Sequence, residues 1–306
     1  MKLVAAIVGP TGIGKSKLGL LLARTLDAEI VNADSRQIYR YMDIGTAKPN
    51  PEERASVPHH LVDIVDPDED FSLALYRSLA YSCVEDIIQR GKLPILVGGS
   101  GLYVWAILEG WNIPEVPPNP EFRRQMEKTA LVEGVDALYR RLESIDPVSA
   151  GRMNPQNLRR IIRALEIYEA THRPPSQLQG KTQPGFDTFI VGLTTERQRL
   201  YQMIDRRVDD MIQRGLVAEM KGLVDKGYGI GLPSMSSVGY RQIGQFIRGE
   251  LDLSTAIQQI KFETHRFARH QYAWFRLTDP RIKWFDIGHN LDAGVLDLLK
   301  EKVRLS

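Results

Sequence analysis

Short continuous apolar runs alternate with longer segments of helical periodicity along the first third of the chain. The apolar runs predict strands at residues 2–8, 29–32, 61–65 and 93–97. Between them, apolar residues recur every three to four positions and predict helices at residues 15–26 and 72–89. Strands that alternate with helices in this way are typical of a parallel sheet with helices on both faces. We therefore expect an α/β core whose ligands bind at the carboxyl ends of the strands.

The pattern changes in the middle of the chain. A proline-rich segment at residues 113–120 (IPEVPPNP) predicts a linker, and helical periodicity then continues to about residue 172. Apolar runs at residues 186–193 and 282–287 predict a return to the sheet, followed by a last helix from residue 291. We expect residues 1–114 to form the first part of the core, 115–182 an inserted all-helical domain, and 183–306 the return to the core, mostly helical with basic segments.

Composition adds little to this picture but excludes several classes of protein. Of 306 residues, 43% are hydrophobic and 25% charged, and the net charge of +2 does not by itself indicate a nucleic-acid-binding protein. Cys83 is the single cysteine, which excludes an internal disulfide and a zinc site built on paired cysteines. The first strand follows Met1 without a signal peptide, and no apolar run reaches membrane-spanning length. We expect a soluble cytoplasmic protein with no membrane contact.

The most specific motif is the sequence GPTGIGKS at residues 9–16, between the first predicted strand and the first predicted helix. This is the context that a phosphate-binding P-loop requires. The glycines let backbone N–H groups converge on a phosphate, and the helix N-terminus adds partial positive charge. Lys15 would reach the outer phosphate and the Ser16 hydroxyl would hold Mg²⁺. The residues expected to bind a diphosphate or triphosphate are Gly9, Pro10, Thr11, Gly12, Ile13, Gly14, Lys15 and Ser16.

Two other turns follow predicted strands and should meet the P-loop at the same edge of the sheet. Asp34 lies just past the second strand, where a carboxylate could accept a proton from a nucleophile or help hold Mg²⁺. Capping of a short helix by Asp34 or Ser35 is the alternative, and both readings stay open. The GGSG turn at residues 98–101 could contact a second substrate, or let its helix pack close to the sheet with Ser100 as N-cap.

Basic residues cluster in the second half of the chain. Arg159, Arg160 and Arg163 fall on one predicted helical face and could contact the phosphates of a nucleic acid. The alternative is a solvated face with acidic partners such as Glu166. Residues 261–276 interleave basic and aromatic side chains, a combination that suits single-stranded RNA, although the rings could instead belong to the core.

Taken in chain order, these motifs resemble those of the bacterial tRNA dimethylallyltransferases, also called tRNA isopentenyltransferases. The matching segments are GPTGIGKS at 9–16, DSRQIY at 34–39, MDIGTAKP at 42–49, PHHL at 58–61, GGSGLY at 98–103, RALE at 163–166, VGYRQ at 238–242 and WFR at 274–276. The resemblance implies a core related to P-loop kinases, whose loop holds a prenyl diphosphate. It implies transfer of a dimethylallyl group from dimethylallyl diphosphate to the exocyclic amine of the adenosine immediately 3′ of the tRNA anticodon, giving isopentenyladenosine and diphosphate.

The resemblance also implies roles for individual residues. Asp34 would be the general base, Thr11, Lys15 and Arg207 would stabilise the leaving diphosphate, and Ser16 would help hold Mg²⁺, the one implied cofactor. The helical insertion would clamp the anticodon arm of the tRNA, and we expect a monomer. The residues implied to contact tRNA are Ser35, Arg36, Gln37, Ile38, Ser100, Arg123, Arg159, Arg160, Ile161, Ile162, Arg163, Ser236, Ser237, Val238, Gly239, Tyr240 and Arg241.

Three alternative functions share parts of this pattern. A free-nucleotide isopentenyltransferase would have the same loop and aspartate, but it would not need the inserted helical domain and its arginines. A small-molecule P-loop kinase would consume ATP and phosphorylate a hydroxyl. A non-catalytic RNA-binding protein would bind RNA in a nucleotide-dependent way and tolerate the loss of Asp34.

Overall fold

A computed structural model describes residues 2–288 and 291–305, and the chain divides into two compact units. The first unit comprises Met1–Ser72, Tyr76–Leu108 and Pro184–Ser306, and the second comprises Leu73–Leu75 and Glu109–Gln183. Apart from Leu73–Leu75, the second unit begins at Glu109, whereas the proline-rich segment predicts a boundary at residue 115.

A six-stranded sheet forms the centre of the first unit, in the order β3-β2-β4-β1-β7-β8, and every neighbouring pair is parallel. Its strands are β1 (Leu3–Val8), β2 (Ala28–Asn32), β3 (His59–His60), β4 (Leu93–Val97), β7 (Asp187–Thr194) and β8 (Ile282–Asp286). The central strands β1 and β4 are buried along their whole length, which explains their continuous apolar sequences. Because Asn32 and Ile7 both pair with Val97, the turns after β1, β2 and β4 begin at one edge of the sheet. The predicted α/β core is confirmed.

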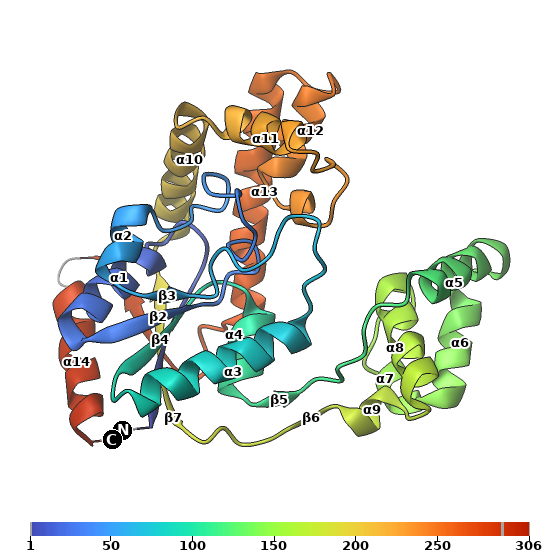
Figure 1. Cartoon of the computed structure of the whole chain (residues 1–306), viewed down its shortest axis with the longest axis horizontal. Coiled ribbons are helices and arrows are strands. Elements are labelled where there is room, and N and C mark those ends of the chain that lie inside the picture. The colour runs from blue at the N-terminus through green and yellow to red at the C-terminus, as the bar shows by residue number, and fades with distance from the viewer. Residues whose placement is uncertain (1, 289–290, 306) are drawn as a thin grey trace. The chain divides into compact units, whose positions relative to one another are not determined.

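Helices of the first unit pack on this sheet and on one another (Figure 1). They are α1 (Lys15–Leu26), α2 (Pro51–Ser56), α3 (Leu73–Gln89), α4 (Gly101–Leu108), α10 (Arg197–Gln213), α11 (Leu216–Asp225), η1 (Ser234–Ser236), α12 (Tyr240–Ile247), α13 (Leu253–Trp274) and α14 (Leu291–Leu305). Helix α1 packs against β1, β2, β4 and α14, with Leu18 and Leu22 one turn apart on its buried face. Helices α10 and α13 contact each other, and Ile204, Val208 and Ile260 extend the same buried cluster.

The predicted strand at residues 61–65 is wrong. The strand in this region is β3, which contains only His59–His60. Leu61 and Asp63 have φ angles of 61° and 58°, in the left-handed region where a strand cannot continue. The chain turns there, and Val65 regains only an isolated bridge to Tyr39.

The second unit is mainly helical. Its elements are α5 (Pro120–Glu133), α6 (Val135–Ile145), α7 (Pro147–Ala150), α8 (Leu158–Thr171), α9 (Pro175–Leu178) and the antiparallel pair β5 (Trp111–Asn112) and β6 (Gly180–Lys181). Met126, Leu138, Leu142, Ile161 and Leu165 form the centre of its own core. Among the described residues, no helix of either unit is long and apolar enough to cross a membrane.

Candidate active site

The phosphate loop at residues 9–16 joins β1 to α1 at the carboxyl edge of the sheet. Gly9 has a φ angle of 140°, and a Cβ atom there would lie 2.6 Å from the carbonyl oxygen of Leu193 on β7. Only glycine fits so close to the neighbouring strand. Gly14 is the N-cap of α1 and has no side chain to bond the first N–H groups of that helix. These N–H groups and the helix dipole form an anion site.

Lys15 bends back over this loop. Its Nζ donates hydrogen bonds to the carbonyl oxygens of Gly9 at 3.0 Å and Pro10 at 2.9 Å. Burial and the nearby Arg207 lower the pKa of Lys15 to about 7, although Asp34 opposes the shift. An anion at the loop would favour the charged form of Lys15, so this ammonium is suited to a diphosphate.

Asp34 follows the end of β2, and the next helix, α2, begins only at Pro51, so the helix-capping alternative is wrong for this residue. Its Oδ1 accepts a hydrogen bond from the backbone N–H of Arg36 at 2.9 Å, and its own N–H donates to Asn32 Oδ1 at 3.0 Å. The carboxylate is therefore held in a local turn. Burial lowers the pKa of Arg207 on α10, and the carboxylate of Asp34 opposes this shift.

Two adjoining cavities of the first unit, of about 280 and 320 Å³, meet at these residues. Both are lined by Thr11, Gly12, Lys15, Asp34, Arg207 and Met211. The first, here the loop cavity, is completed by the start of α1, including Ser16, and by apolar Ile30 and Val97. The second, here the α13 cavity, is completed by Ser35, Ser100, residues 236–239 and Phe267 of α13. Two substrates could therefore meet at Asp34 from separate cavities.

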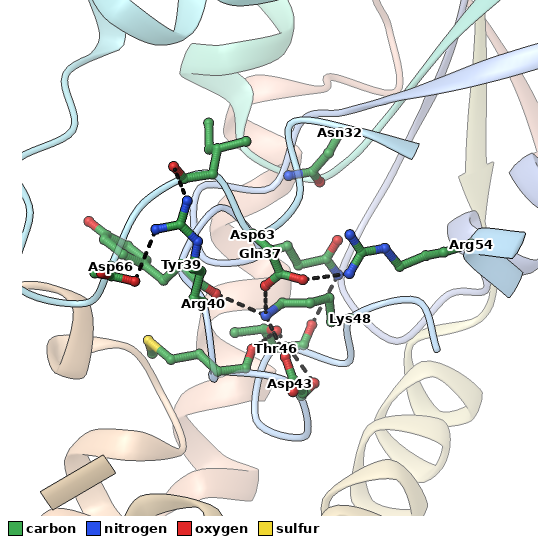
Figure 2. A network of polar contacts seen from close by, with 12 residues as sticks. Asn32, Gln37, Tyr39, Arg40, Asp43, Thr46, Lys48, Arg54, Asp63 and Asp66 are labelled. Atoms are coloured by element: carbon green, nitrogen blue, oxygen red, sulfur yellow. Dashed lines mark hydrogen bonds and ion pairs between the residues drawn. The ribbon is translucent and has the colours of Figure 1, made fainter. Parts of the chain in front are cut away.

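A network of polar contacts holds the segment at residues 42–49 against both cavities (Figure 2). The buried Lys48 Nζ binds the carbonyl oxygen of Tyr39 at 2.9 Å and carboxylate oxygens of Asp43 and Asp63, each at 2.5 Å. The Gln37 amide donates to the carbonyl oxygens of Thr46 and Ala47, each at 3.1 Å. Polar groups inside and around the segment thus hold its shape, and Gln37, which the resemblance implies as a tRNA contact, has a structural role there.

A carboxylate from α11 fastens the same segment from the other side. Glu219 accepts hydrogen bonds from the N–H groups of Asp43, Ile44 and Gly45, at 3.0, 2.7 and 3.1 Å. It also accepts one from the Tyr240 hydroxyl at 2.5 Å. These contacts fix the wall that Gly45 and Thr46 contribute to the α13 cavity.

The structure brings together several residues that the resemblance implies as tRNA contacts. Ser35, Arg36, Ser100 and the run from Ser236 to Gly239 all line the α13 cavity. The Ser100 hydroxyl accepts a hydrogen bond from the Ser35 N–H at 3.0 Å, so the turns after β2 and β4 are joined. Arg36 Nη1 donates to the carbonyl oxygen of Pro233 at 3.0 Å and so holds the 233–236 segment at the cavity.

Other implied tRNA contacts are buried, and the structure does not support a direct role for their side chains. Ile38 and Tyr240 belong to the main core at 1% and 0% exposure, and Tyr240 is engaged by Glu219. Ile161 and Ile162 belong to the core of the second unit at 0% and 5% exposure. Ile38 lies in a turn and the other three lie on buried faces of helices, and each is needed for packing.

The four arginines of the second unit that the resemblance implies as tRNA contacts divide into two groups. Arg123 and Arg163 bind the buried carboxylate of Glu166, at 2.8 and 2.5 Å, and Arg163 also donates to the Val116 carbonyl oxygen. Burial would raise the pKa of Glu166, but these bonds outweigh it and the pKa is lowered. The acidic-partner alternative therefore holds for Arg163. Arg159 and Arg160, at the start of α8, are exposed and remain available for an anionic partner.

Sequence reasoning missed one buried polar residue of this site. Gln271 of α13 lies among the basic and aromatic positions of residues 261–276, but it is 4% exposed and lines the α13 cavity. Its amide contacts both the phosphate loop and the turn after β4. The only signal in the sequence is the spacing of Gln271. It follows Ala268 by three positions and so falls on the same, buried face of the helix.

The oxygen donors at the loop cavity suit a hard cation such as Mg²⁺. Ser16, Asp34 and Asp210 line this cavity, and hydroxyl and carboxylate oxygens are the ligands that Mg²⁺ prefers. Within the described ranges, no cluster of three or more His, Cys, Asp or Glu residues could hold a metal ion by itself. A cation here would need oxygens from a bound phosphate, as is usual for Mg²⁺.

Comparison with known proteins gives a consistent result. The family model described as IPP transferase matches residues 37–278. A tRNA dimethylallyltransferase of Roseiflexus castenholzii is 53% identical over 271 residues, which cover 89% of each chain. One from Thermomicrobium roseum is 48% identical over 305 residues, covering 100% of this chain and 92% of the relative.

Solved structures agree with the sequence comparison. A full-length tRNA isopentenylpyrophosphate transferase from Bacillus halodurans superposes with a TM-score of 0.73 at 39% identity, covering 99% of this chain and 97% of that one. A eukaryotic dimethylallyltransferase acting on tRNA superposes with a TM-score of 0.82 at 27% identity, covering 100% of this chain and 80% of that one.

Proposed function

Since this chain belongs to the IPP transferase family, we propose that it transfers a dimethylallyl group from dimethylallyl diphosphate to the exocyclic amine of the adenosine immediately 3′ of the anticodon in tRNA. The observation that carries the proposal is that Thr11, Lys15, Asp34 and Arg207 line both of two adjoining cavities. A transferase needs two substrates to meet at one set of charged groups, and this arrangement supplies that place. We further propose that the enzyme acts as a monomer in the cytoplasm, where it meets its tRNA.

The loop cavity is the proposed site for the prenyl diphosphate. The N–H groups at the start of α1, Lys15 and Arg207 would bind the diphosphate oxygens as they gain negative charge. Ser16 would hold Mg²⁺ there, and the cation would help neutralise the leaving diphosphate. Apolar Ile30 and Val97 offer this cavity a surface for the prenyl chain.

The α13 cavity is the proposed site for the acceptor base. An adenine stacked in the anticodon arm cannot reach Asp34, so the base must leave the stack and enter this cavity. The adenine amine is a poor nucleophile because its lone pair is delocalised into the ring. Asp34 would accept the proton of the amine as nitrogen attacks the allylic carbon. The new C–N bond replaces the C–O bond to the diphosphate, which leaves with the electron pair.

The decisive experiment offers both classes of acceptor to the purified protein. Each reaction contains Mg²⁺, radiolabelled dimethylallyl diphosphate and either unmodified tRNA or AMP. A parallel reaction also contains a metal chelator. We expect label in tRNA, at the adenosine 3′ of the anticodon, and loss of transfer when the metal is removed. Label only in AMP would establish the free-nucleotide alternative. Phosphate transfer from ATP without prenyl transfer would establish a kinase.

A further inference from the structure

Helix α13 inserts a buried amide between two loops of the candidate active site. The Oε1 of Gln271 accepts a hydrogen bond from the backbone N–H of Thr11 at 2.7 Å, and its Nε2 donates to the carbonyl oxygen of Gly99 at 2.9 Å. Thr11 lies in the phosphate loop after β1, and Gly99 lies in the turn after β4. One side chain therefore joins two turns that line the α13 cavity.

The chemistry of this contact requires a carboxamide. An amide offers one acceptor and one donor, and here each faces the complementary backbone group. A carboxylate would offer only acceptors and would repel the carbonyl oxygen of Gly99. A Cβ atom at Gly99 would lie 2.2 Å from the Gln271 Nε2, so the absence of a side chain there lets the amide approach.

The contact acts on the peptide group that anchors Lys15. The Thr11 N–H and the Pro10 carbonyl belong to one planar peptide unit. Gln271 binds its N–H, and the Lys15 Nζ donates to its carbonyl oxygen at 2.9 Å. The orientation of this peptide therefore sets where the Lys15 ammonium and the Thr11 hydroxyl lie at the junction of the two cavities.

We propose that Gln271 is a positioning residue for group transfer: it fixes the Pro10–Thr11 peptide and so places Lys15 and Thr11 around the leaving diphosphate. This inference rests on the proposed function of the phosphate loop as the prenyl diphosphate site. It predicts effects on diphosphate binding and turnover that pass through the loop.

Two substitutions test the proposal. Gln271→Met keeps the length of the side chain but removes both hydrogen bonds. We expect its affinity for Mg²⁺ and inorganic diphosphate, measured by calorimetry, and its kcat for tRNA prenylation to fall by about tenfold or more, because small misplacements of reacting groups are costly. Gln271→Glu keeps the bond to Thr11 but adds negative charge, so diphosphate should bind more weakly than to Gln271→Met.

Gln258→Met is the matched control, since Gln258 is an exposed residue of the same helix. It should behave as wild type in every assay. The proposal is overturned if folded Gln271→Met binds diphosphate and turns over within twofold of wild type, even when its melting temperature falls. If Gln271→Met does not fold, the same limits applied to Gln271→Glu decide the question. If the wild-type protein binds diphosphate but labels no tRNA, the proposed function is refuted. The comparison of diphosphate affinity between wild type and Gln271→Met still tests the role of Gln271 in that case.

Discussion

At the scale of single residues, Asp34 has two separable duties: one oxygen holds the local turn, and the carboxylate is the proposed base. Asp34→Asn keeps an oxygen that can accept the Arg36 N–H but cannot take a proton. We expect transfer to tRNA to fall by about a hundredfold or more, as is typical for loss of a general base, with diphosphate binding intact. Single-turnover labelling and calorimetry measure the two effects.

Asp34→Ala provides the comparison, because it removes both duties. If Asp34→Asn retains wild-type turnover and only Asp34→Ala is impaired, Asp34 serves the turn and not proton transfer. A parallel loss of turnover and diphosphate binding in Asp34→Asn would also contradict the assignment as base.

The lowered pKa of Lys15 predicts a pH effect on diphosphate binding. With a pKa of about 7 in the free protein, Lys15 is mostly neutral at pH 8. A bound diphosphate favours the ammonium and raises this pKa, so binding at pH 8 should take up a proton at Lys15. This contribution weakens binding as pH rises above 7 and is absent well below pH 7. Calorimetry in buffers of different ionisation enthalpy measures the uptake.

Lys15→Met supplies the reference for that measurement, because diphosphate itself also titrates. The difference in proton uptake between wild type and Lys15→Met should approach one proton at pH 8 and vanish near pH 6. Equal uptake by the two proteins at pH 8 would show that the protonation of Lys15 does not change when the ligand binds, and would contradict the prediction.

Sequence reasoning found site residues where the information is local. The loop that carries Lys15 and the turn that carries Asp34 each follow a predicted strand, and parallel strands bring such connections to one edge. Gln271 was not predictable, because its partners are 260 and 172 residues away in the chain. Ile38 and Tyr240 show the opposite error: they match motifs of the family, but they serve the core.

At the scale of elements, buried strands were predictable and the connection at residues 61–65 was not. β2 and β4 are buried along their whole length, because parallel strands are covered on both faces, and β4 is a continuous apolar run. The apolar residues after His60 also look like a strand, but Leu61 and Asp63 adopt left-handed backbone. There Asp63 binds Lys48 and Arg54, contacts between distant segments that periodicity cannot show.

Lys48 is the centre of that connection and its loss should be costly. Its side chain is 2% exposed and binds Asp43 and Asp63. Lys48→Met keeps the apolar stem but leaves two carboxylates without their shared cation. We expect unfolding in urea to require about 2 kcal/mol less free energy, in the range for losing hydrogen bonds to charged groups, because both carboxylates stay partly exposed and Asp63 keeps its bond to Arg54. Lys221→Met, at an exposed position of α11, should change stability by less than about 0.5 kcal/mol.

A result for Lys48→Met that matches Lys221→Met would mean that the network of Figure 2 contributes little to stability. Because the segment at residues 42–49 lines both cavities, we also expect Lys48→Met to impair turnover in the folded protein. The motif MDIGTAKP thus serves the shape of the site more than its chemistry.

At the scale of the whole molecule, the chain combines a proposed diphosphate site in one unit with exposed arginines in the other. The second unit has its own core and supplies no residue of the two cavities described above. A free nucleotide would have no need of it, whereas an anticodon arm offers many phosphates. We therefore expect the second unit to carry the distinction between tRNA and a free nucleotide as acceptor.

Arg160 tests this division of labour. Arg160→Ala should weaken tRNA binding and reduce the slope of log affinity against log salt concentration by about one, the expectation for one lost phosphate contact. Diphosphate binding should not change, since that site lies in the other unit. Arg140→Ala, an exposed arginine on α6, is the control for a general loss of positive charge.

Arg163→Ala should behave differently, although Arg163 is one turn away on the same helix. Arg163 binds Glu166 and the Val116 carbonyl oxygen, so its loss should lower the melting temperature of the protein before it changes the salt slope. Arg160 makes no bond to Glu166, and Arg160→Ala should melt as wild type does. If the salt slope of Arg160→Ala is unchanged, or falls only as much as the salt slope of Arg140→Ala, the exposed face of α8 is an ordinary solvated surface. Recognition of tRNA would then depend on the α13 cavity and its surroundings.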